Sequence, residues 1–177
     1  MSRKNPRGWL ASAAALALCW CWSWSGTGCS PQKREPPPEI RPLEPYSVRA
    51  RVLSKTEYGE HWAPVDVFLC WGELLDRRKT EGVVVQQGDR MGWWFPPKDS
   101  GLQGLNHLVA NTHLIADDEE MRQKILEISK GDQIYVEGAL VEVRLASGKK
   151  MKSSLSRTDR GLGACEVLLV KKLEILP

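Results

Sequence analysis

Residues 132–144, D-Q-I-Y-V-E-G-A-L-V-E-V-R, form the clearest strand pattern in this sequence, and they decide the expected fold. The apolar positions change phase at Gly138: they are Ile134 and Val136 before the glycine, and Ala139, Val141 and Val143 after it. Such a change at a glycine is typical of a β-bulge, which bends a strand around a barrel. The stretch therefore predicts a bent strand in a small closed sheet.

Three segments that precede this strand also predict β-structure. Residues 46–54 alternate between apolar and polar side chains, as a strand with one buried face does. Residues 64–75 indicate a strand followed by a helical turn. Residues 82–87 and 91–95 indicate a hairpin around the turn Gln87-Gly88-Asp89.

One helix is expected directly before the bent strand. Asp117 or Asp118 can cap it, because a carboxylate there accepts hydrogen bonds from N–H groups that lack a helical partner. Its apolar stripe consists of Met121, Ile125 and Ile128. The order of elements matches a mainly β fold, a small OB-like five-stranded barrel with one helix before the penultimate core strand and an extra hairpin.

Side chains that can bind a ligand or take part in catalysis are concentrated in residues 149–170, K-K-M-K-S-S-L-S-R-T-D-R-G-L-G-A-C-E-V-L-L-V. Alternating segments flank a polar stretch that contains two glycines, which predicts a strand, a tight turn and a returning strand. Such a hairpin would place Arg157 and Asp159 at a strand end, where a small barrel opens to ligand.

Residues 1–29 have the layout of a signal peptide or membrane anchor. Three basic residues precede an uncharged run, and Gly28 stands directly before Cys29. This pattern resembles the lipobox of bacterial lipoproteins, although Gly26 stands where that family prefers leucine. Three outcomes are open: acylation of Cys29, cleavage that releases the protein, or retention of the segment as an anchor. Each places the folded part in the bacterial envelope, facing the periplasm.

Residues 30–45 contain six prolines and predict an extended linker, so the folded domain is expected over residues 46–177. Without the three basic residues of the signal, basic and acidic residues are equal in number, which does not favour nucleic acid as a partner. Residues 144–172, however, carry eight basic and two acidic residues, a patch that suits an anionic ligand or headgroup.

Two of the five cysteines, Cys70 and Cys165, lie in the expected domain. In an oxidising compartment they are a candidate disulfide, and the alternative is two separate buried thiols. No pair of cysteines or histidines has the spacing of a zinc site. We therefore expect no metal and no cofactor.

Three motifs resemble those of a group of uncharacterised bacterial envelope proteins. They are A-P-V-D with Trp71-Gly72, N-T-H-L-I at residues 111–115, and S-S-L-S-R-T-D at residues 153–159 with G-A-C-E at residues 163–166. The likeness covers roughly residues 46–173. This resemblance implies a location in the cell envelope and does not imply an activity.

A nucleophilic site is possible if Cys165 and His113 meet, because a thiolate needs a neighbouring base and a third group that orients the base. Asn111 or Asp159 could orient the base. Serine hydrolysis is less favoured, since no Gly-x-Ser-x-Gly motif surrounds the paired serines. Arg157 and Asp159 are expected to form a local ion pair or turn cap, or Arg157 to clamp an anion.

The preferred function is a membrane-tethered extracytoplasmic binding or scaffolding module, whose partner is a protein or an anionic ligand of the envelope. Its expected binding residues are Asn111, His113, Ser153, Ser154, Arg157, Asp159 and Glu166. The alternative is a thiol or hydrolytic enzyme that uses Cys165 and His113.

Overall fold

The computed structural model describes residues 36–59, 62–159, 161 and 163–177. The predicted signal segment with Cys29, and the first part of the predicted linker, lie outside the described residues. No helix among the described residues has the length and apolar character needed to cross a membrane.

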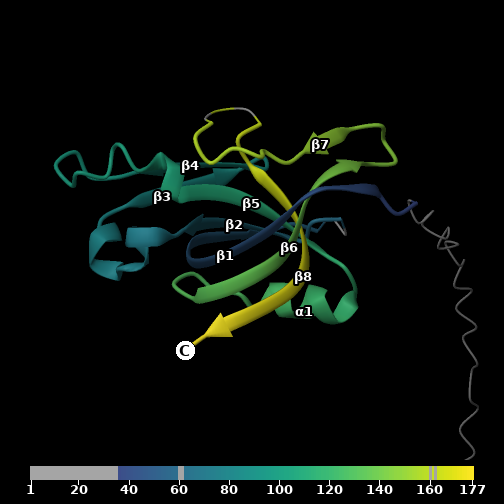
Figure 1. Cartoon of the computed structure of the whole chain (residues 1–177), viewed down its shortest axis with the longest axis horizontal. Coiled ribbons are helices and arrows are strands. Elements are labelled where there is room, and N and C mark those ends of the chain that lie inside the picture. Colours follow the sequence, from purple (N-terminus) through teal and green to yellow (C-terminus); the bar gives the residue numbers. More distant parts are fainter. Residues whose placement is uncertain (1–35, 60–61, 160, 162) are drawn as a thin grey trace, which may run out of the picture. The chain divides into compact units, whose positions relative to one another are not determined.

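The fold is mainly β, with five strands that close into a ring (Figure 1). These strands are β1 (Glu39–Glu57), β2 (Val65–Cys70), β5 (Val109–Ala116), β8 (Glu166–Leu176) and β6 (Gln133–Arg144), in their order around the sheet. The ring closes because β1 also pairs with β6. Neighbours are antiparallel except β5 and β8, which are parallel.

Shorter elements decorate the ring. They are the 3-10 turns η1 (Gly72–Leu75), η2 (Arg77–Thr80) and η3 (Asn106–Leu108), the hairpin β3 (Val84–Gly88) with β4 (Met91–Phe95), the helix α1 (Glu119–Glu127) and the short strand β7 (Lys150–Lys152). The strand and helical turn predicted over residues 64–75 and the hairpin predicted at 82–95 are both confirmed. In Figure 1, α1 and the loop between β7 and β8 lie at opposite ends of the ring.

The predicted helix is confirmed, and it contributes side chains to the interior of the ring. Asp118 caps α1, because its side chain accepts a 2.8 Å hydrogen bond from the Met121 N–H. The apolar stripe of Met121, Ile125 and Ile128 is buried in the same cluster as the inward side chains of β1, β2, β5, β6 and β8. Burial of this stripe, rather than the length of the helix, stabilises such a short element.

The bent strand is confirmed, but the irregularity lies in its partner. Glu137 of β6 pairs with Lys172 and Gly138 pairs with Val170, so the extra residue is Lys171 of β8. A Cβ atom at Gly138 would overlap the carbonyl oxygen of Leu169, which explains the glycine. The alternation of β6 continues past the glycine: Leu140 lies in the interior cluster with Ile134 and Val136. Val141 and Val143 pack on the opposite face of the strand, in a second apolar cluster.

The hairpin predicted over residues 149–170 is wrong. β7 has three residues and pairs with β6, and residues 153–159 and 163–165 lie outside any strand. The predicted returning strand does not pair with β7, because β5 and β6 already pair with the two sides of β8 at residues 168–170. The two segments contact each other through 3.0 Å hydrogen bonds from the Ser154 N–H to the Cys165 carbonyl and from the Val167 N–H to the Ser153 hydroxyl.

The predicted linker ends earlier than residue 45. β1 starts at Glu39, and residues 39–45 pair with the end of β6. Pro42 and Pro45 are tolerated because this part of β1 has a strand on one side only, and an edge does not require their missing N–H groups.

Candidate functional site

Five polar side chains meet on the outer face of the ring, and we call them the thiol cluster. They are Asp66 of β2, Arg90 of the β3–β4 turn, Asn111 and His113 of β5, and Cys165 directly before β8. Asp66 and His113 are register partners in neighbouring strands. Leu114 faces the interior, so alternation along β5 places His113 and Asn111 on the outer face.

The β3–β4 hairpin delivers Arg90 to this face. Asp89 and Arg90 occupy the turn with φ values of 51° and 65°, the left-handed conformation that tight hairpins require. A Cβ atom at Gly92 would lie 2.7 Å from the Phe68 ring and 2.8 Å from the Asn111 side chain. The hairpin therefore lies directly against β2 and β5, and the glycine permits this approach.

Asp66 contacts both basic side chains of the thiol cluster. Its Oδ1 atom lies 2.7 Å from Arg90 Nη1 and 2.8 Å from His113 Nδ1. The side chains of Asp66 and His113 are at most 2 % exposed. The Arg90 guanidinium also donates to the Ala63 carbonyl at 2.9 Å and lies 3.6 Å from the centre of the Tyr58 ring.

His113 is held as a cation. Burial alone would lower its pKa, but hydrogen bonds to Asp66 and Cys165, and their negative charges, outweigh burial and raise the pKa to about 9. The imidazole is therefore protonated at neutral pH, between a carboxylate and a sulfur atom. An imidazolium in this position stabilises a thiolate.

Asn111 and Arg90 complete the surroundings of the Cys165 sulfur. The Asn111 Nδ2 atom lies 3.6 Å from this sulfur, and it also donates to the Arg90 carbonyl at 3.3 Å. The Asn111 Oδ1 atom accepts from Gln87 Nε2 at 2.8 Å. Asp66, Asn111 and His113 are buried, whereas Cys165 is half-buried and is the most exposed residue of the cluster.

The sequence identified two members of this cluster as a nucleophile and base, and the structure brings them together. The group next to the His113 imidazole is Asp66, and not Asn111 or Asp159 as the sequence suggested. Asp159 instead accepts a 2.7 Å hydrogen bond from the Ser154 hydroxyl. Asp66 could have been suspected, because a carboxylate inside a short strand of otherwise apolar residues must have a buried partner.

A second group, which we call the mouth cluster, lies around the start of β8. It consists of Tyr46, Trp71, Thr112, Arg157 and Glu166. Glu166 is 4 % exposed, and Thr112 donates to its Oε2 atom at 3.4 Å. Burial raises the pKa of Glu166 to about 7. Burial, together with the Glu166 charge, also raises the pKa of Tyr46 to about 12.

Arg157 is the exposed cation of the mouth cluster. Its guanidinium carbon lies 4.6 Å from the Trp71 ring and 5.0 Å from the Tyr46 ring. Among the residues described, it forms no ion pair with Asp159, so that part of the expectation is wrong. Its charge acts instead on the buried Glu166 carboxylate. Ser153 and Ser154 support the loop instead, because the Ser153 hydroxyl accepts from the Val167 N–H and the Ser154 hydroxyl accepts from the Ser156 N–H, both at 3.0 Å.

The candidate disulfide is absent from the structure, because Cys70 and Cys165 are both free thiols. Cys70 is fully buried, its sulfur lies 3.4 Å from the Leu74 carbonyl, and burial raises its pKa to about 11. The two thiols thus differ: Cys70 is an apolar core residue, and Cys165 belongs to a charged cluster.

The predicted site residues therefore form two neighbouring groups. Asn111, His113 and Cys165 meet on the outer face, while Arg157 and Glu166 meet in the mouth cluster, with Ser153, Ser154 and Asp159 in the adjoining loop. Comparison with protein-family models gives no match for this chain, and comparison with curated proteins gives none of significant similarity.

Proposed function

We propose that this protein is a binding or scaffolding module of the bacterial envelope, tethered to a membrane through its N-terminus. The signal layout, the glycine before Cys29 and the proline-rich segment that follows support this location. The segment up to β1 would act as a spacer between the membrane and the folded domain. The resemblance to uncharacterised envelope proteins agrees with this location.

The module is proposed to have an OB-like fold. Three features support this assignment: the strand order around the ring, the helix between β5 and β6, and the parallel pairing of β5 with β8. Proteins of this architecture commonly bind ligands on one face or at loops of the barrel, although fold alone does not determine function.

The observation that carries the binding proposal is the state of Arg157. This exposed guanidinium is held over two aromatic rings, and its nearest electrostatic partner is the buried Glu166, with which it forms no ion pair. A positioned and exposed cation is suited to bind a carboxylate or phosphate of an envelope protein or another anionic ligand. The nearby lysines at positions 150 and 152 add positive charge to the same region.

Affinity capture from membrane fractions tests this proposal. Proteins recovered with the wild-type chain should be lost with Arg157→Gln and retained with Arg144→Gln, which removes an exposed arginine of β6 from outside the mouth cluster. Equal recovery with both variants would contradict a role for Arg157. Mass spectrometry of the mature N-terminus, with Cys29→Ser as the control, tests the tether.

A thiol enzyme is the second candidate, and the contact of Cys165 with His113 and Asp66 supports it. A cysteine nucleophile is activated by an imidazole that contacts its thiol and by a carboxylate that contacts the imidazole. Alkylation by iodoacetamide should modify Cys165 at neutral pH at least about tenfold faster than an ordinary thiol, which is mostly protonated there. Cys165→Ala should abolish this reaction, and Cys70→Ala should not.

The dependence of this reaction on Asp66 separates the second candidate from an ordinary half-buried thiol. Asp66→Asn should slow the alkylation of Cys165, because it removes the charge that keeps His113 protonated. An unchanged rate would contradict an activated nucleophile.

A further inference from the structure

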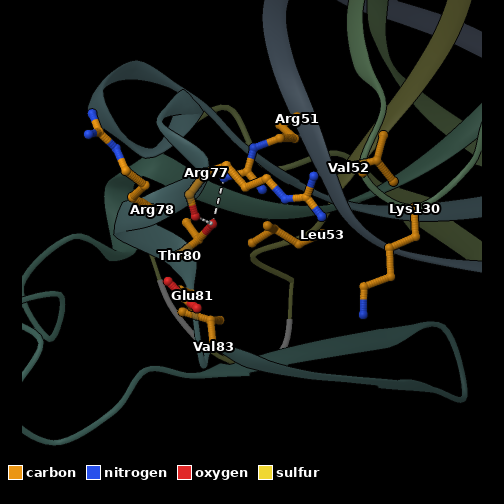
Figure 2. Close-up of a pocket in the computed structure, with 10 residues that line it drawn as sticks. Arg51, Val52, Leu53, Arg77, Arg78, Thr80, Glu81, Val83 and Lys130 are labelled. Carbon is orange, nitrogen blue, oxygen red and sulfur yellow. Dashed lines mark hydrogen bonds between the residues drawn. The ribbon is translucent and has the colours of Figure 1, made fainter.

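A pocket of about 650 Å³ opens away from both clusters, and none of its lining residues belongs to either of them (Figure 2). It lies between the middle of β1, the turn η2, the residues before β3 and the loop that follows α1. Val52, Leu53 and Val83 supply its apolar side chains, and Arg51, Arg77 and Lys130 supply positive charge. This volume is within the range of small-molecule sites.

Arg51 is a buried cation that no described carboxylate neutralises. The residue is 7 % exposed, and its Nη2 atom donates to the Leu74 carbonyl at 2.8 Å and to the Thr80 hydroxyl at 2.5 Å. Its Nε atom is buried without a hydrogen-bond partner. A buried guanidinium that has only neutral acceptors is costly, and an anion in the adjoining pocket would reduce that cost.

Two exposed cations face the same space. Figure 2 shows the Arg77 side chain extending across the pocket towards Leu53, with Lys130 on the opposite side. Neither forms an ion pair with any residue that the structure describes. Arg78 also lines the pocket, but its guanidinium points away in Figure 2 and pairs with Asp76 at 3.0 Å. Glu81 is the single acidic residue among the described lining residues.

We propose that this pocket binds a small ligand through a phosphate group. Three cations around one space suit a phosphate dianion better than a carboxylate, because a dianion can accept charge-assisted hydrogen bonds from several donors at once. The apolar side chains of Val52, Leu53 and Val83 then contact the carbon part of the ligand. A free phosphorylated molecule and a phospholipid headgroup share this chemistry.

Calorimetry on the full chain at low salt tests the assignment, with phenyl phosphate as the probe. Phenyl phosphate should bind, and benzoate, which has the same ring but one charge, should bind at least about tenfold more weakly. Arg77→Gln and Lys130→Gln should each weaken phenyl phosphate binding by about tenfold or more. Both side chains are exposed, so their replacement should not prevent folding.

Lys79→Gln is the matched control, because it removes a positive charge from the same turn η2 at a residue that does not line the pocket. The proposal is overturned if phenyl phosphate does not bind, if benzoate binds equally well, or if Lys79→Gln weakens binding as much as Arg77→Gln. Competition with inorganic phosphate and with a short-chain phosphatidic acid distinguishes a free phosphorylated ligand from a phospholipid headgroup. Displacement by either supports phosphate recognition, and displacement by neither overturns it.

Discussion

At the scale of single residues, Glu166 should control how stability depends on pH. Its folded-state pKa of about 7 lies above its ordinary value of 4.5, so ionisation is harder in the folded chain than in the unfolded one. The free energy of unfolding should therefore be highest below pH 4.5, and should fall by up to about 3 kcal/mol as the pH rises to 7. Urea unfolding at a series of pH values measures this fall.

Glu166→Gln should remove most of that fall, because glutamine stays neutral at every pH. The exposed Glu44→Gln is the control and should leave it unchanged. His113 gives a second pH dependence of the free energy of unfolding. Its folded-state pKa of about 9 lies above its ordinary value of 6.5, so its contribution to stability is complete below pH 6.5 and is lost as the pH rises through 9. If Glu166→Gln keeps the full dependence between pH 4.5 and 7, the buried carboxylate is not its source.

The residue scale also shows what the sequence could identify in the candidate site. Cys165 and His113 were predicted as partners from their chemical types, and they meet. Asp66 was missed because its partner is set by the register of β2 against β5, and a single sequence does not reveal register. Asp159 was suggested as the orienting group, but its carboxylate accepts a hydrogen bond from the Ser154 hydroxyl within the loop.

At the scale of elements, Gly138 fixes the approach of β6 to β8. An alanine there would place its Cβ atom against the Leu169 carbonyl, and backbone atoms cannot move aside as a flexible side chain can. We expect Gly138→Ala to lower the free energy of unfolding by at least about 2 kcal/mol. In Gly104→Ala the added atom meets nothing within 4 Å, so the change should stay within about 0.5 kcal/mol. Equal effects in denaturant titrations would contradict this explanation.

Element types were easier to predict than element partners. The capped helix, the β3–β4 hairpin and the strand β6 follow from local signals, namely an acidic cap, a tight turn and periodic apolar residues. β5 was not recognised as a strand, because its mixture of Asn, Thr and His does not alternate in polarity, although nearly all of it is buried. The predicted pairing of residues 149–170 failed because periodicity does not reveal which edge a strand joins.

At the scale of the whole molecule, the start of β1 sets the boundary of the folded domain. Residues 39–45 pair with β6, and Ile40 packs on the cluster that contains Val141 and Val143. A chain that begins at residue 46 would expose this cluster, whereas one that begins at residue 36 would keep it covered.

Loss of residues 39–45 should lower the free energy of unfolding by roughly 3 kcal/mol, which is the order expected for uncovering one or two buried aliphatic side chains. Thermal and urea unfolding of chains that begin at residues 36 and 46 measures the difference. The chain that begins at residue 36 keeps the pairing of residues 39–45 with β6 and should be the more stable of the two. Equal stability of the two shortened chains would mean that the proline-rich end of β1 is a spacer after all, and that the tether extends to Tyr46.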